Sequence, residues 1–147
     1  MTLGVRASRT APSSVAQHGD CGRIHPRGAL MDRLVNKAES VRSEATIQSD
    51  VRMLLLDASL GLAEQDLDVN LETPAGNGRR IDVEVGCTVI EVKRSLATPG
   101  AVEAARMQLA GYVATRSSEM GQRYVGILTD GRQWIAYHEV DGGLREP

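Results

Sequence analysis

The fold is decided by the stretch Ile81-Asp82-Val83-Glu84-Val85-Gly86-Cys87-Thr88-Val89-Ile90-Glu91-Val92-Lys93. Side chains alternate across a strand with a period of two residues. The aliphatic residues of the first run, 81–85, should therefore face one side and its two acids the other. In the second run, 88–93, Glu91 and Lys93 share a face. Gly86-Cys87 supplies the tight turn that predicts an antiparallel hairpin.

This hairpin would gather charged side chains at one end. Asp82 on the first run would lie near Glu91 on the second, with Lys93 two residues further on. Two carboxylates at one point make an oxygen-rich site that suits Mg²⁺. A lysine beside a metal can orient a water and neutralise developing phosphate charge, and hydrolysis of a phosphodiester needs both. The alternative interpretation is a solvated sheet face whose charges of both signs are incidental.

A second pair of polar residues lies on a helix predicted from Ala101 to Thr115. Gln108 and Tyr112 are four residues apart, so they occupy one face of that helix. An amide and a phenol on one face can orient a phosphate or Lys93. Alternatively, Gln108 lies at the surface and Tyr112 packs half-buried.

Another helix is predicted before the hairpin, from residue 32 or 37 to residue 60, with Gly61 as its C-terminal stop. Its apolar stripe also contains Glu44 and Gln48. A charge that faces inward without a partner is costly. Glu44 therefore needs a partner, such as an arginine or Lys93.

The remaining segments complete an α/β pattern. Residues 67–71 alternate like a strand, and residues 73–78 read as a loop by composition. Arg79-Arg80, which follow that loop, could contact a DNA backbone or be solvated hairpin ends. Residues 124–137 read as a hairpin around an Asp130-Gly131 turn. The predicted order is helix, three strands, helix, two strands.

The arrangement of Asp82, Glu91 and Lys93 resembles the signature of the PD-(D/E)xK nuclease superfamily, which has the restriction-endonuclease-like fold. Gln108-x-x-x-Tyr112 matches a pattern that many members carry on the next helix. Ile127-Leu128-Thr129-Asp130-Gly131, followed by Trp134 and Tyr137, is similar to a segment of restriction-type N-terminal domains. The features are closest to the N-terminal nuclease domains of type I restriction motor subunits. The resemblance covers residues 37–138 and lacks the proline of the signature, since Ile81 precedes Asp82.

The resemblance implies a restriction-endonuclease-like αβββαβ(β) core with a mixed central sheet flanked by helices. It implies a Mg²⁺-dependent DNA endonuclease of restriction or DNA-processing type, in which Mn²⁺ can replace Mg²⁺. Asp82, Glu91 and Glu44 would be metal ligands, Lys93 would orient the attacking water, and Gln108 and Tyr112 would support the site. The implied partners are DNA and a methyltransferase or a helicase/translocase subunit. The alternative is a catalytically silent module of the same fold that binds DNA or such a partner.

Composition sets the bounds on these expectations. The chain has 147 residues, of which 41% are hydrophobic and 24% charged, and this suits one domain with its own core. Phe is absent, so the core must rest on aliphatic residues and methionine. The net charge of −2 is not the basic balance typical of nucleic-acid-binding proteins. DNA contacts would therefore have to come from a local basic patch.

Domain organisation follows from a shift in composition near residue 30. Residues 1–30 are rich in Arg, Gly, Ser, Ala and Pro without periodicity, which predicts a disordered arm before a domain at 31–147. No segment resembles a membrane span or the apolar core of a signal peptide, so we expect a cytoplasmic protein. Cleavage of both DNA strands needs two sites. We therefore expect a homodimer or a larger partner, with an exposed edge of the 124–138 hairpin as a pairing surface.

Overall fold

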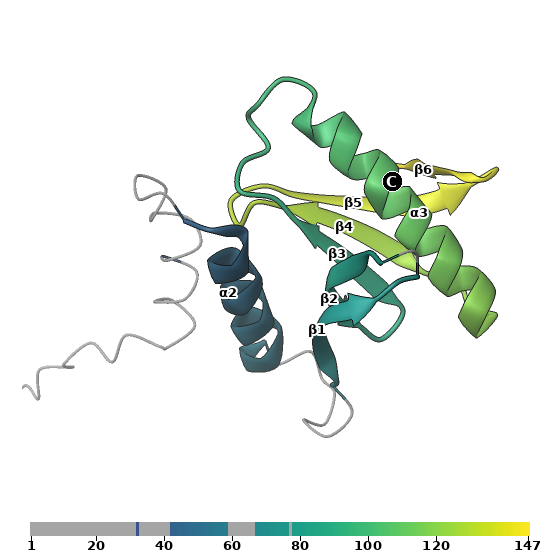
Figure 1. Cartoon of the computed structure of the whole chain (residues 1–147), viewed down its shortest axis with the longest axis horizontal. Coiled ribbons are helices and arrows are strands. Elements are labelled where there is room, and N and C mark those ends of the chain that lie inside the picture. The colour runs from purple at the N-terminus through teal and green to yellow at the C-terminus, as the bar shows by residue number, and fades with distance from the viewer. Residues whose placement is uncertain (1–31, 33–41, 59–66, 77) are drawn as a thin grey trace, which may run out of the picture.

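A computed structural model of the protein describes residues 32, 42–58, 67–76 and 78–147. These residues form an α/β structure with a six-stranded mixed sheet and two helices, α2 (Glu44–Asp57) and α3 (Ala101–Met120) (Figure 1). The strands are β1 (Val69–Pro74), β2 (Arg80–Val85), β3 (Thr88–Val92), β4 (Val125–Thr129), β5 (Trp134–Val140) and β6 (Gly143–Arg145). The predicted N-terminal arm and residues 33–41 of the first predicted helix lie outside the described residues.

The sheet follows the order of the chain, β1 to β6, and among these six strands one pair is parallel. That pair is β3–β4, and α3 makes the crossover between its strands. The other neighbours in this sheet pair antiparallel, including the predicted β2–β3 hairpin, which turns at Gly86-Cys87. Helix α3 contacts β3 to β6 and α2 contacts β1 to β3. The parallel pair brings the C-terminal ends of β3 and β4 to one edge, where ligand sites of α/β sheets commonly form.

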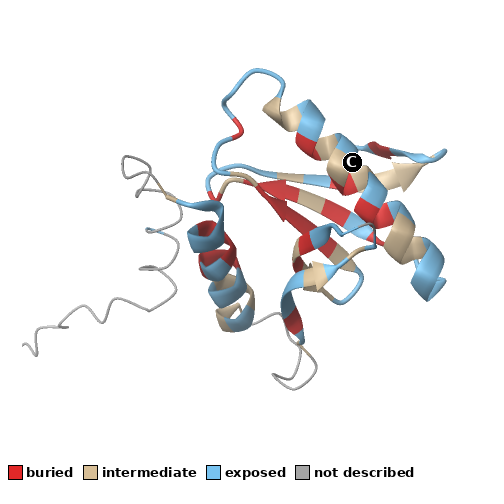
Figure 2. Cartoon of the chain, viewed as in Figure 1, coloured by how far each residue is buried: buried red, intermediate tan, exposed pale blue. Residues whose placement is uncertain are grey.

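The core consists of two clusters of buried residues on the two faces of the sheet (Figure 2). Alternation along β3 divides its residues between them: Val89 packs in the cluster that holds α3, whereas Ile90 and Val92 pack in the cluster that holds α2. By the same alternation, Glu91 belongs to the α3 face. The sheet therefore directs one acidic side chain of β3 into the layer between sheet and helix.

The predicted strict alternation along residues 81–85 is wrong at Ile81. Val83 packs in the α2 cluster, whereas Ile81 packs in the α3 cluster. The paired residues of β2 and β3 run only from Val85↔Thr88 to Val83↔Ile90. Beyond them β1 also departs from regular strand geometry, since Glu72 has a φ of 52°. The side chains of Ile81 and Val83 therefore lie on opposite faces of the sheet, and the alternation of side chains is interrupted at Asp82, the position between them.

Both helices differ from their predicted bounds. Arg42 and Ser43 are not helical, and α2 begins at Glu44 because the Ser43 side chain caps it by accepting from Thr46 N at 3.2 Å. It ends at Asp57, before the predicted stop, as Ala58 is extended. Helix α3 runs five residues beyond the predicted end, to Met120, and Gly121 caps it with a φ of 62°. Its last turns are anchored by Arg116, which binds Glu84 on β2 and Glu119.

The strands at the two sheet edges differ most from the prediction. Strand β1 begins at Val69 and includes Thr73 and Pro74, where a loop is predicted; a proline is tolerated there because β1 is an edge strand. The β4–β5 hairpin agrees with the prediction, but the sequence does not predict β6. Strand β3 covers the outer side of β4, whereas β6 pairs with β5 only at residues 138–140. The outer edge of residues 134–137 therefore has no strand partner among the described residues, and the pairing surface stays a prediction. No helix within the described ranges is long and apolar enough to cross a membrane.

Gly126 lets α3 approach the sheet. A Cβ at Gly126 would lie 2.9 Å from Cγ and Cδ2 of the buried Leu109 and 3.2 Å from Cγ2 of Val113. Gly126→Ala should therefore destabilise the protein by about 1–3 kcal/mol through overpacking. Gly111→Ala is the matched control, since a Cβ there meets nothing within 4 Å and should add about 0.5–1 kcal/mol of helix stability. Urea unfolding of both variants checks this, and equal effects would contradict it.

Candidate functional site

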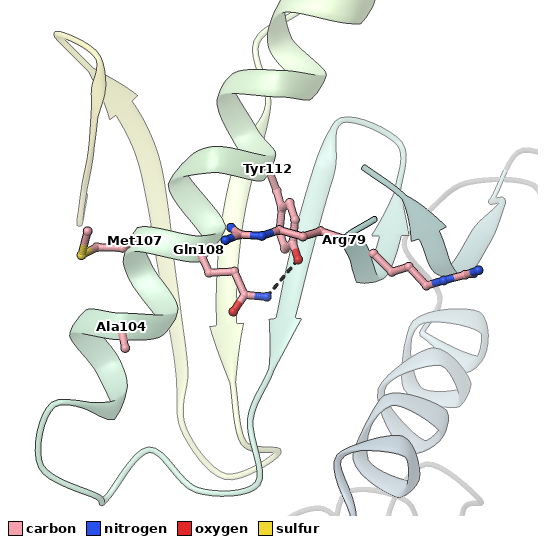
Figure 3. A pocket seen from close by; sticks show the side chains of 6 residues that line it. Arg79, Ala104, Met107, Gln108 and Tyr112 are labelled. Carbon is pink, nitrogen blue, oxygen red and sulfur yellow. Dashed lines mark hydrogen bonds between the residues drawn. The ribbon is translucent and has the colours of Figure 1, made fainter. Parts of the chain in front are cut away.

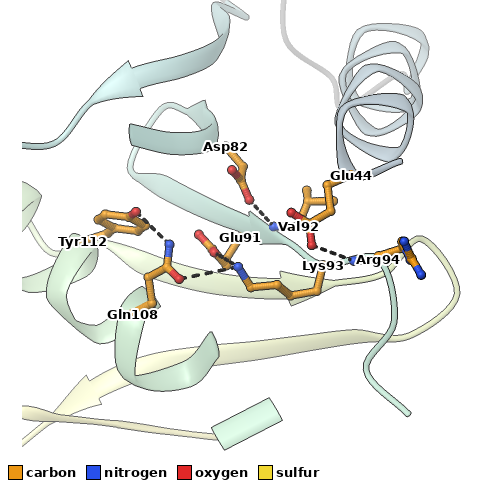
Figure 4. Close-up of polar contacts among 8 residues, drawn as sticks. All are labelled: Glu44, Asp82, Glu91, Val92, Lys93, Arg94, Gln108 and Tyr112. Atoms are coloured by element: carbon orange, nitrogen blue, oxygen red, sulfur yellow. Dashed lines mark hydrogen bonds and ion pairs between the residues drawn. The ribbon is translucent and has the colours of Figure 1, made fainter. Parts of the chain in front are cut away.

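The sequence-predicted side chains meet where β2, β3 and α3 come together (Figure 4). Glu91 is the penultimate residue of β3 and Lys93 follows the strand directly. The backbone of Lys93 remains attached to the sheet because its N–H donates to Thr129 O at 2.8 Å. The base of the Lys93 side chain is therefore fixed although the strand has ended.

Glu91 is the most unusual residue of the site because it is fully buried, with an exposure of 0%. Its Oε1 accepts from Lys93 Nζ at 2.5 Å, while its Oε2 is buried without a hydrogen-bond partner among the described residues. Burial and the nearby charge of Asp82 raise the pKa of Glu91 to about 7, against the opposing effect of Lys93. A buried carboxylate oxygen without a partner is costly, and a bound cation would remove that cost.

Asp82 lies on β2, at the point where the regular pairing of β2 with β3 ends. Its Oδ2 accepts from the backbone N–H of Val92 at 2.7 Å, in the place of a strand carbonyl. Burial raises the pKa of Asp82, although the Val92 hydrogen bond and the charge of Lys93 oppose the rise. The charge of Asp82 also acts on the pKa values of Glu91 and Lys93, which agrees with the closeness of these side chains in Figure 4.

Lys93 is held between Glu91 and helix α3. Burial alone would lower the pKa of Lys93, but the hydrogen bond and charge of Glu91 outweigh it, so the pKa is raised and the group remains an ammonium. Lys93 Nζ lies 3.5 Å from Gln108 Oε1, and Gln108 Nε2 donates to Tyr112 Oη at 2.9 Å. Tyr112 is buried rather than half-buried. The series of contacts Tyr112–Gln108–Lys93–Glu91 thus joins both predicted motifs.

Glu44 is placed at the margin of the site. The prediction that it faces inward is wrong: as the first residue of α2 it precedes the packed turns of the helix and is exposed. Its Oε1 accepts from the backbone N–H of Arg94 at 3.1 Å, which is its partner in place of a cationic side chain. Among the residues that the structure describes, no three His, Cys, Asp or Glu side chains are placed to hold a metal ion together. A metal here would rest on Asp82 and Glu91, and ligation by Glu44 remains a prediction.

Asp130 is a further site residue, which the sequence indicates only as part of a turn. Its Oδ2 accepts from Leu96 N at 3.0 Å, and its Oδ1 accepts from Arg132 N and Gln133 N at 3.0 and 2.9 Å. These hydrogen bonds lower the pKa of Asp130 in spite of its burial. Asp130 therefore tethers the segment after Lys93 to the β4–β5 turn. The signal was the Asp-Gly pair, whose aspartate commonly accepts from nearby backbone N–H groups.

Comparison of the chain with protein-family models, with curated proteins and with solved structures gave no significant match.

Proposed function

We propose that the protein is a Mg²⁺-dependent DNA endonuclease of restriction or DNA-processing type, with Mn²⁺ able to replace Mg²⁺. One observation carries the proposal: Glu91 is fully buried beside Asp82, with one oxygen bound to Lys93 and the other without a partner in the described part of the chain. A carboxylate of this kind does not stabilise a hydrophobic core, because burial disfavours its charged form. Binding of a cation by Glu91 and Asp82 would explain why the two carboxylates lie together at this position.

The proposed fold is the restriction-endonuclease-like core. In its favour, the described elements follow one another as helix, three strands, helix and further strands, with a mixed sheet between two helices. Asp82 lies on β2, Glu91 on β3 and Lys93 directly after it, which is the placement that the signature requires. Gln108 and Tyr112 on α3 reach the same point.

The donor set fits a magnesium ion. Mg²⁺ retains several waters and is usually bound through one or two carboxylates together with substrate phosphates, so two carboxylates suffice. When bound, the metal would supply Lewis-acid stabilisation of the phosphoryl oxygens and a water of lowered pKa. The pKa of Glu91 near 7 means that its carboxylate is available to a cation above neutral pH.

The side chains around the carboxylates have separate roles in this proposal. Lys93 holds the attacking water through its ammonium and neutralises charge that develops on the phosphate. Gln108 positions Lys93, and Tyr112 fixes the amide of Gln108. Asp130 positions the backbone after Lys93 through Leu96.

A second candidate is a catalytically silent module of the same fold that binds DNA or a larger partner, such as a methyltransferase or a translocase subunit. The observation that favours it is the short ion pair between Lys93 and Glu91. In this pair the ammonium group proposed to orient the water is bound to one of the carboxylate oxygens proposed to bind the metal.

Supercoiled plasmid separates the two candidates. With Mg²⁺ or Mn²⁺ the purified protein should nick plasmid, and with Ca²⁺ it should bind without cleavage. One chain has one such site, so a monomer should nick, and double-strand breaks should require two copies or a partner, as light scattering beside the assay would show. A preparation of Asp82→Asn made in parallel controls for contaminating nuclease. Binding without nicking under all three metals would favour the silent module.

A further inference from the structure

Two cavities beside the first half of α3 share Ala104 and Gln108 as lining residues, and together they are called the groove below. The smaller, of about 460 Å³, is lined by Lys93, Arg94 and Ser95 among others, and the larger, of about 690 Å³, by Arg79, Arg80, Met107 and Tyr112. Ala104 and Gln108 line both cavities. Figure 3 shows the larger one. The groove therefore passes the proposed catalytic lysine and continues along the helix toward the start of β2.

The ends of this groove carry arginines without carboxylate partners in the described part of the chain. Arg79 and Arg94 make no side-chain hydrogen bond there, and Arg80 binds only the backbone carbonyl of Glu72, at 3.0 Å. By contrast, Arg106 and Arg116 are each paired with glutamates. Lys93 and Arg94 line the smaller cavity together with Glu44, and Arg79 and Arg80 line the larger cavity, which has no acidic lining residue. This is the local basic patch that the net charge of −2 does not reveal.

We propose that the groove binds one strand of DNA, with Arg79 and Arg80 contacting a phosphate on one side of the scissile position and Arg94 a phosphate on the other. This inference rests on the proposed function and identifies how its substrate is held. Guanidinium groups bind phosphate oxygens strongly, through paired N–H donors. Ala104 and Met107, which is 69% exposed, supply an apolar wall for sugar or base.

The same lining predicts weak sequence preference. The neutral polar side chains of the larger cavity are Gln108 and Tyr112, which bind one another. Phosphate contacts position a nucleic acid but do not read its sequence. Affinity should therefore depend strongly on salt and little on base composition.

Fluorescence anisotropy of a 5′-labelled single-stranded oligonucleotide tests the proposal, with the full chain in Ca²⁺ so that turnover does not interfere. Arg79→Ala/Arg80→Ala should weaken binding about tenfold or more. The slope of log affinity against log salt should fall by roughly 0.7 for each phosphate that the variant no longer neutralises.

Two single variants complete the experiment. Arg94→Ala should weaken binding in the same way through one phosphate, and its guanidinium has no hydrogen bond among the described residues whose removal would threaten folding. Arg123→Ala is the control of equal charge. The Arg123 guanidinium binds Glu139 O at 3.4 Å, away from the groove, and its effect on affinity should stay within about twofold.

The outcomes separate this proposal from the proposed function. If the groove variants bind as tightly as Arg123→Ala with the same salt slope, or the unmodified protein binds no oligonucleotide, the groove is not the strand site. Nicking of plasmid by a protein whose binding ignores these arginines would refute the groove and leave the hydrolysis standing. Arginine-dependent binding without cleavage under any metal would support the groove and refute the hydrolysis.

Discussion

Lys93→Ala should reduce metal-dependent DNA cleavage by about 100-fold or more, because the ammonium acts mainly on the charge of the transition state. Its Nζ binds Glu91 and lies within 3.5 Å of Gln108, and among the described residues no other cation is hydrogen-bonded to Glu91. The loss should appear in single-turnover nicking rates, with oligonucleotide affinity in Ca²⁺ changed much less.

The Lys93 variant needs two controls. Removing Lys93 takes away a charge that lowers the pKa of Glu91, so that this pKa should rise further, and rates must be compared from pH 7 to 9. Arg145→Ala removes an equal charge from β6 and should leave the rate unchanged. A Lys93→Ala protein that nicks as fast as the parent across this pH range would show that Lys93 has no catalytic role.

Glu91→Gln should strongly reduce cleavage and yet stabilise the metal-free protein. Folding raises the pKa of Glu91 from 4.5 to about 7, so the folded state retains a proton that the unfolded state has released. Stability from this group is fully present below pH 4.5 and is lost as the pH rises through 7, a loss of about 3 kcal/mol. A neutral amide avoids most of that cost, so Glu91→Gln should gain about 1–3 kcal/mol at pH 8. Cleavage should fall by roughly 1,000-fold or more, since a bound metal contributes several kcal/mol to the transition state.

Unfolding followed by the single tryptophan, Trp134, measures this gain at pH 5 and pH 8 with and without Mg²⁺. Mg²⁺ should stabilise the parent at pH 8 and not the Glu91→Gln variant, because only the parent has the ligand. Glu103→Gln is the control: Arg106 lowers the pKa of that exposed glutamate, so its loss should not stabilise. A Glu91→Gln protein less stable than the parent at pH 8 would show that the carboxylate serves the fold.

The hairpin and the α3 motif could be predicted because each depends on local chemistry. A two-residue turn between alternating runs specified the β2–β3 pairing, and a four-residue spacing put Gln108 and Tyr112 on one face. These patterns place Asp82, Glu91 and Lys93 at one point without any knowledge of tertiary contacts. The alternative interpretation, a solvated sheet face whose charges are incidental, does not agree with the complete burial of Glu91.

What could not be predicted depends on contacts between distant segments. The apolar stripe predicts that Glu44 faces inward, but the Ser43 cap makes it the first helical residue, beyond the packed turns. The alternation of side chains is interrupted at Asp82, beside a β1 strand in which Glu72 has a φ of 52°, and no period within residues 81–85 encodes this interruption. Strand β6 is three residues long and pairs with β5, which leaves almost no sequence pattern to detect.

We infer that Glu91 is buried beside Asp82 in order to hold a divalent metal, and anomalous diffraction from Mn²⁺ in crystals grown at pH 8 can locate that ion. One anomalous peak should lie within about 2.0–2.6 Å of carboxylate oxygens from both Asp82 and Glu91. Mn²⁺ bound elsewhere, with Glu91 still joined to Lys93 and its second oxygen without a ligand, would contradict the claim.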